Sequence, residues 1–201
     1  AGTALAEALF GDYSPAGRLT STWLADTGSL PEPGPETEEF RVNAVDMLEY
    51  DVISAGLTYR YSKAEAVYGF GHGLSYTTFA YGPLEAPEEV AAETPFTVAL
   101  EVTNTGERAS DEVVLLFASA CDSAYGDRIP RMQLAGFERI ADVAPGETRR
   151  VAIEVDPADL FVWDASRGER IVETGRYLLF VGAEAEGPQK EVHIEGETLA
   201  P

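Results

Sequence analysis

The side chains with the most obvious catalytic potential in this sequence are carboxylates. Asp and Glu together number 35, against 14 Lys and Arg. Adjacent acidic pairs occur at Glu38-Glu39, Glu88-Glu89 and Asp111-Glu112. General acid–base catalysis needs carboxyl groups held at a defined separation, whereas most Asp and Glu side chains are simply solvated. No catalytic motif surrounds any of these pairs, so we interpret all three as solvated charge pairs and expect no catalytic residue among them.

The chain has one cysteine and two histidines, so few residues could support cysteine or histidine chemistry. Cys121 is the only cysteine, which excludes an intrachain disulfide and a CxxC site. A cysteine nucleophile would need a neighbouring base, and neither His72 nor His193 lies in a motif for that role. We expect Cys121 to be a structural thiol, and we expect neither a metal site nor a cofactor.

The overall charge restricts the partners. The net charge is −21, which repels nucleic acid and anionic membrane surfaces. No apolar run approaches the roughly 18 residues that a membrane span requires. We expect a soluble protein, cytoplasmic or secreted, without nucleic-acid or membrane partners. An acidic surface selected for high salt and the ordinary acidic bias of a GC-rich genome both explain the charge.

The first 24 residues predict the end of a larger α/β domain. Leu5, Leu9 and Phe10 have helical spacing, Gly11 ends the helix, and 18–24 is consistent with a short strand. One helix and one strand cannot bury a core, and the chain does not start with Met. We therefore expect 1–24 to be the C-terminal remnant of an α/β domain whose main part lies upstream.

Residues 25–73 predict a long connector. The stretch 25–50 is rich in Pro, Glu, Gly and Thr, which disfavours regular structure, and aromatic residues follow. These aromatic side chains would be left in water unless the connector lay on a partner surface. The residues that we expect to dock it are Tyr59, Arg60, Tyr61, Phe70 and His72.

From residue 74 to 201, short β-prone runs alternate with turn signals. Phe96 to Asn104 alternates with period 2, which places Phe96, Val98, Leu100 and Val102 on one face. The expected strands are 75–82, 96–104, 112–119, 132–139, 147–155, 160–164, 169–173, 176–183 and 189–195. Strands of this length and spacing predict a mainly β fold, an antiparallel β-sandwich of the immunoglobulin or fibronectin III type. We expect Trp163 to belong to its core.

Several segments in a consistent order resemble family 3 glycoside hydrolases, the β-glucosidase and β-xylosidase group. Ala6 to Leu19, with Gly17-Arg18-Leu19, is similar to the end of their α/β-sandwich domain. Thr58-Tyr-Arg-Tyr61 and Tyr68-Gly-Phe-Gly-His-Gly-Leu-Ser-Tyr-Thr-Thr-Phe79 resemble their connector. Val102-Thr-Asn-Thr-Gly106, Leu160-Phe-Val-Trp-Asp164 and Glu173-Thr-Gly-Arg-Tyr177 resemble the fibronectin type III-like domain of many members.

The resemblance implies a retaining β-glycosidase that releases terminal glucose or xylose from β-linked oligosaccharides or aryl glycosides. Retention uses two carboxyl groups roughly 5–5.5 Å apart. In the family both precede the segments matched here, in the TIM-barrel and α/β domains. We therefore carry over no catalytic residue and expect this part to be inactive alone, bracing those two upstream domains.

Three residues are candidates for contact with a sugar: Arg60, His72 and Tyr125. Each has an alternative: Arg60 and His72 as fixing residues of the connector, and Tyr125 as a loop aromatic covering the sandwich. Two other functions stay open, a carbohydrate-binding sandwich module and a protein-interaction sandwich of the cell surface, because a sandwich fold alone does not define function.

Overall fold

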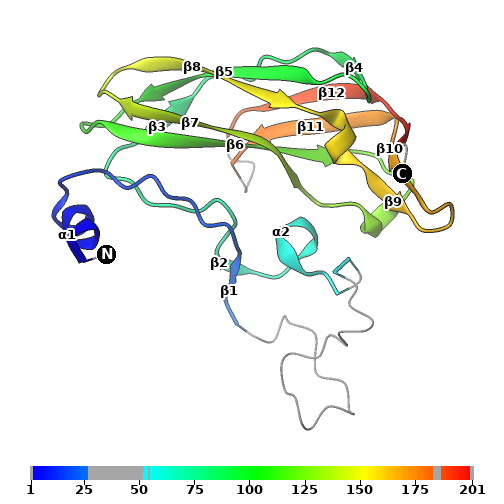
Figure 1. Cartoon of the computed structure of the whole chain (residues 1–201), viewed down its shortest axis with the longest axis horizontal. Helices are drawn as coiled ribbons and strands as arrows, with labels where there is room; N and C mark the ends of the chain where they lie inside the picture. Colours follow the sequence, from blue (N-terminus) through cyan, green and yellow to red (C-terminus); the bar gives the residue numbers. More distant parts are fainter. Residues whose placement is uncertain (1, 27–51, 54, 183–186, 200–201) are drawn as a thin grey trace, which may run out of the picture.

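The computed structural model describes residues 2–26, 52–53, 55–182 and 187–199. Two β-sheets form a sandwich, and the N-terminal helix and the described part of the connector, from residue 55 on, lie on one side of it, below the sandwich in Figure 1. The fold is mainly β, as predicted. The proposed linker 25–50, which includes the pair Glu38-Glu39, lies outside the described residues except for residues 25 and 26.

The larger sheet has five strands. Their order is β4 (Glu89–Ala91), β12 (Gln189–Glu195), β11 (Gly175–Val181), β6 (Ser110–Ala120) and β7 (Gln133–Val143). All neighbours are antiparallel except β4 and β12, which run parallel. Strand β4 is not among the strands expected from the sequence, because it has three residues, begins with Glu89 and lacks an apolar alternation.

The second sheet faces the first and has three strands. They are β3 (Phe79–Tyr81), β5 (Phe96–Asn104) and β8 (Thr148–Val155), in this order. The period-2 face predicted for β5 is confirmed, because Val98, Leu100 and Val102 are fully buried. Val114 and Leu116 of β6 meet them in the same core. Apolar residues at alternate positions thus direct both sheets toward one interior.

Short elements complete the structure. They are α1 (Gly2–Phe10), β1 (Trp23–Leu24), α2 (Thr58–Tyr61), β2 (Ala66–Tyr68), η1 (Gly126–Arg128), η2 (Pro157–Leu160), β9 (Val162–Asp164), β10 (Glu169–Val172) and β13 (Glu197–Leu199). The strand expected over 75–82 forms only at β3, and the one expected over 18–24 only at β1. Strand β1 pairs with β2, so the connector returns to the N-terminal segment.

The predicted burial of Trp163 is wrong. Its side chain is 48% exposed, while its neighbours Val162 and Asp164 are buried. In strand β9 the side chains of Val162 and Asp164 therefore point inward and that of Trp163 points outward, the reverse of the expected orientation. Asp164 is buried because it accepts hydrogen bonds from the backbone N and Oγ of Ser166, at 2.9 and 2.6 Å, which compensates for its removal from water.

Candidate interdomain docking site

Aromatic rings of the connector stack on the larger sheet. Tyr59 stacks on Phe70 with ring centroids 4.2 Å apart. Both rings form T-shaped contacts with Phe117 on β6, with centroid distances of 6.2 and 6.1 Å. Phe117 in turn stacks on Phe180 of β11 at 5.7 Å. Edge-to-face and offset contacts of this kind add to the energy of apolar burial, so these four rings, the aromatic cluster, fasten the connector to the sandwich.

Hydrogen bonds surround the aromatic cluster. Arg60 Nη2 donates to Gln133 Oε1 at 2.6 Å. The backbone amide of Arg131 donates to the carbonyl of Arg60 at 2.7 Å, and the amide of Leu134 donates to the Tyr59 hydroxyl at 3.2 Å. Arg60 also lies over the ring of Tyr61, 5.7 Å from its centroid. These contacts join α2 to the start of β7.

The glycine-rich segment joins the connector to the N-terminal segment. The amide of Leu19 donates to the carbonyl of His72 at 2.8 Å, and the amide of Gly71 donates to the carbonyl of Leu19 at 2.7 Å. A Cβ at Gly73 would lie 2.4 Å from the carbonyl oxygen of Gly17. The absence of a side chain at Gly73 therefore permits the two backbones to approach this closely. The His72 ring lies beside Tyr68 at 4.7 Å.

A buried ion pair anchors the same N-terminal segment to the sandwich. Arg18 Nη2 donates to both carboxylate oxygens of Glu112, at 2.5 and 2.7 Å. The Tyr81 hydroxyl donates to Glu112 Oε1 at 2.7 Å. The Glu112 side chain is 1% exposed and that of Arg18 is 21% exposed. Burial, followed by the charge of Glu112, raises the pKa of Tyr81 above its usual range.

This arrangement corrects the interpretation of Asp111-Glu112 as a solvated pair. Asp111 is partly exposed and pairs with Arg139, and the hydrogen bond from Arg139 holds the pKa of Asp111 below its usual value. Glu112, however, is buried with Ser110 and Val114, the alternate residues of β6. That shared parity was the signal available in the sequence, because alternate residues of a strand point to one face.

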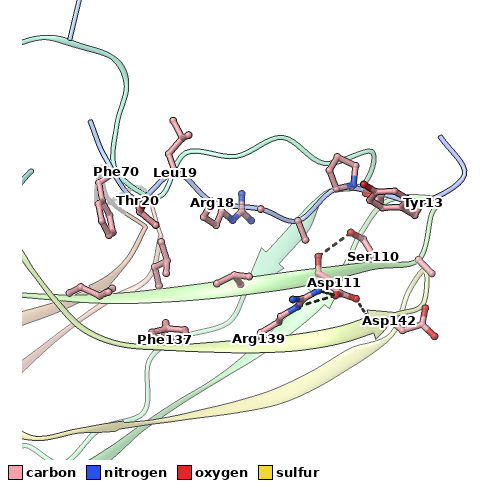
Figure 2. A pocket seen from close by; sticks show the side chains of 18 of the residues that line it. Tyr13, Arg18, Leu19, Thr20, Phe70, Ser110, Asp111, Phe137, Arg139 and Asp142 are labelled. Carbon is pink, nitrogen blue, oxygen red and sulfur yellow. Dashed lines mark hydrogen bonds and ion pairs between the residues drawn. The ribbon is translucent and has the colours of Figure 1, made fainter. Parts of the chain in front are cut away.

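A cavity of about 880 Å³ lies next to the ion pair, between residues 12–20 and the surface of β6 and β7. Figure 2 shows Tyr13, Arg18 and Leu19 above the strands, while Phe137 and Arg139 lie at the level of the strands. Val113, Leu115 and Leu134 also line it. Of the residues expected to dock the connector, Phe70 lines this cavity.

Tyr125 takes part in a separate network at the other end of β6. Its hydroxyl donates to Asp164 Oδ2 at 3.0 Å, and partial burial raises its pKa. The preceding amide, of Ala124, donates to Glu173 Oε1 at 2.9 Å. These bonds tie the loop after β6 to β9 and to the turn before β11, so the Tyr125 hydroxyl is engaged within the protein.

The remaining candidates for chemistry show no reactive arrangement in the described part of the chain. Cys121 is an exposed residue. Partial desolvation of its thiol nevertheless raises the pKa of the thiol, which disfavours the reactive thiolate. The described residues contain no group of three or more His, Cys, Asp or Glu side chains suited to a metal ion. Among the described helices, none has the length and apolar character of a membrane span.

The architecture thus defines a β-sandwich module to which a connector and the end of a preceding segment are fastened. Two family models match the chain: the glycosyl hydrolase family 3 C-terminal domain over residues 1–76, and the fibronectin type III-like domain over residues 112–185. The chain therefore carries the C-terminal region of a family 3 glycoside hydrolase together with its fibronectin type III-like domain.

Individual proteins agree with this assignment. A beta-xylosidase of Formosa agariphila is 36% identical over 184 residues, which cover 91% of this chain and 23% of the relative. The thermostable beta-glucosidase B of Acetivibrio thermocellus is 30% identical over 188 residues, which cover 90% of this chain and 23% of the relative. The structure of beta-glucosidase 3B from Thermotoga neapolitana in complex with alpha-D-glucose matches with a TM-score of 0.79 and 28% identity, over 100% of this chain and 27% of that one. The chain spans about a quarter of the length of these relatives.

Proposed function

We propose that this chain is the non-catalytic C-terminal part of a retaining β-glycosidase, which removes terminal β-linked glucose or xylose from oligosaccharides or aryl glycosides. The observation that carries the proposal is the match of nearly the whole chain to the C-terminal quarter of beta-xylosidases and beta-glucosidases. The upstream partners would be the TIM-barrel and α/β domains of the same enzyme, which supply the two carboxyl groups of the reaction.

The role proposed for the chain itself is mechanical. Residues 1–24 end the α/β domain, 25–73 form the connector, and 74–201 form the sandwich that holds both in place. The aromatic cluster and the Arg18–Glu112 pair support this role, since each joins the sandwich to a segment that precedes it.

The candidate sugar contacts are better explained by the same role. Arg60 Nη2 donates to Gln133, the His72 ring lies against Tyr68, and the Tyr125 hydroxyl donates to Asp164. We therefore propose Tyr59, Arg60, Tyr61, Phe70 and His72 as docking residues. These contacts also count against a carbohydrate-binding module centred on Tyr125.

The direct test is hydrolysis of p-nitrophenyl β-glucoside and β-xyloside. The purified 201-residue chain should release no p-nitrophenol, and the longer enzyme that contains it should release it. Removing 74–201 from that longer enzyme should lower its melting temperature. Turnover by the chain alone that survives repurification and is lost on replacing one of its carboxylates would overturn the proposal.

A further inference from the structure

The carboxylate of Glu112 lies inside the sandwich rather than on its surface. It occupies a buried position of β6, two residues before the core residue Val114. Tyr81, which reaches Glu112 from the opposite sheet, packs against the same core. Gly71, Leu115 and Val181 line the small cavity beside the pair. Because the Glu112 side chain is only 1% exposed, its charge requires a cation nearby.

That cation comes from outside the sandwich, from a segment 94 residues earlier in the chain. Arg18 Nη2 contacts both oxygens of Glu112. Gly73 packs against the aliphatic part and the guanidinium of Arg18. A Cβ added at Gly73 would lie 2.9 Å from Arg18 Nη1 and 3.0 Å from Arg18 Cδ. Arginine suits the site because its guanidinium is planar and more weakly hydrated than an ammonium group. The connector therefore covers the side chain by which the N-terminal segment reaches the carboxylate of Glu112.

We propose that Glu112 and Tyr81 form a recognition site for an arginine carried on an extended Gly-Arg-Leu segment, and that Arg18 in this site sets the register of the preceding domain against the sandwich. A shift of the segment by one residue would leave a buried carboxylate without its cation. Apolar contacts alone do not impose such a penalty, because they tolerate sliding. The inference deepens the proposed bracing role by naming its specificity element.

Amide hydrogen exchange on the 201-residue chain tests the site. The amides of Leu19 and Gly71 report whether the N-terminal segment and the connector stay paired over the site, since each is bonded between these two segments. The amide of Val98, in the core strand β5, reports the sandwich. Arg18→Gln should accelerate exchange at Leu19 and Gly71 by about a hundredfold, because it leaves Glu112 buried and unpaired. Exchange at Val98 should change by less than about threefold.

The double variant gives the decisive comparison. Adding Glu112→Gln to Arg18→Gln removes the stranded charge, so exchange at Leu19 and Gly71 should become slower than in Arg18→Gln alone. The matched control is the exposed pair Arg150–Glu85, which has two contacts of 3.0 and 2.6 Å. Arg150→Gln and Glu85→Gln should change every one of these rates by less than about threefold.

Three results would overturn the inference. The first is exchange at Leu19 and Gly71 that is no faster in Arg18→Gln than in Arg150→Gln. The others are additive effects of Arg18→Gln and Glu112→Gln on these exchange rates, and an equal increase of the exchange rate at Val98. Each concerns docking within this chain. Hydrolysis by the longer enzyme is measured separately, so the recognition site can fail while the proposed function stands.

Discussion

Replacing Gly73 by Ala should lower the stability of the protein, whereas replacing Gly17 by Ala should raise it. The Cβ of Gly73→Ala would lie 2.4 Å from the carbonyl oxygen of Gly17, a backbone atom that cannot rotate away. Nothing lies within 4 Å of a Cβ at Gly17, so Gly17→Ala changes the other partner of the same contact without a clash. Neither glycine has a positive φ, so steric fit alone separates the two variants.

The magnitudes follow from overpacking and from chain entropy. Forcing an extra carbon into a packed contact costs about 1–3 kcal/mol, while replacing Gly by Ala stabilises by about 0.4–1 kcal/mol through the unfolded state. Gly73→Ala should therefore lose about 1–2 kcal/mol, and Gly17→Ala should gain up to about 1 kcal/mol. For a chain of this size the Gly73→Ala loss corresponds to a fall in Tm of about 2–8 °C.

The assay is thermal unfolding followed by near-ultraviolet circular dichroism, which reports the packed rings of the aromatic cluster. Far-ultraviolet spectra at 20 °C serve as the control for an intact sandwich. The reasoning is refuted if Gly73→Ala melts at or above the temperature of Gly17→Ala, because the close approach of the two backbones would then impose no steric requirement.

Three further predictions concern the connector and the core. Phe70→Ala removes a half-buried ring from the aromatic cluster and should lower the free energy of unfolding in urea by about 2 kcal/mol, whereas Phe70→Tyr should retain most of it; equal losses would argue against ring packing. Thr58 has a φ of 64°, strained for a β-branched residue, so Thr58→Asn should raise stability by about 0.5–1 kcal/mol while Thr58→Val should not, as melting curves would show. Burial raises the pKa of Tyr177 to about 12, so the native state keeps a proton that the unfolded chain releases above pH 10. Stability from this group is complete below pH 10 and falls as the pH rises toward 12, by up to about 2–3 kcal/mol; denaturant titrations at several pH values should show a shallower alkaline loss in Tyr177→Phe, and identical slopes would contradict the assignment.

Local alternation was sufficient to predict most of the sandwich. Apolar residues alternate in β5 from Phe96 to Val102 and in β8 from Val151 to Val155, and β12 has Val192 and Ile194. The expected ranges of these three strands differ from those observed by at most one residue. Strand β4 escaped prediction because its position depends on pairing with β12 rather than on its own three residues. Trp163 was misplaced because an aromatic residue in an apolar run is usually buried, whereas here Asp164 takes the inward position to bind the Ser166 backbone.

The docking site was predictable only in part. The aromatic residues of the connector could be identified because water is a poor environment for them, but their partners Phe117 and Phe180 depend on the tertiary fold. Glu112 was misassigned because its neighbour Asp111 is a surface residue and its cation is distant in the sequence. Pairings between remote residues follow from topology, which no local pattern specifies.

The long separation between Arg18 and Glu112 also constrains the order of events during synthesis. The ribosome must add 94 residues after Arg18 before its partner exists. At about 5–20 residues per second that interval lasts roughly 5–20 s. During this time the Gly-Arg-Leu segment and the connector leave the ribosome without the surface on which they come to rest. Docking on β6 therefore follows the synthesis of that strand, and a chaperone that shields aromatic residues such as Tyr59 and Phe70 would act before β6 emerges.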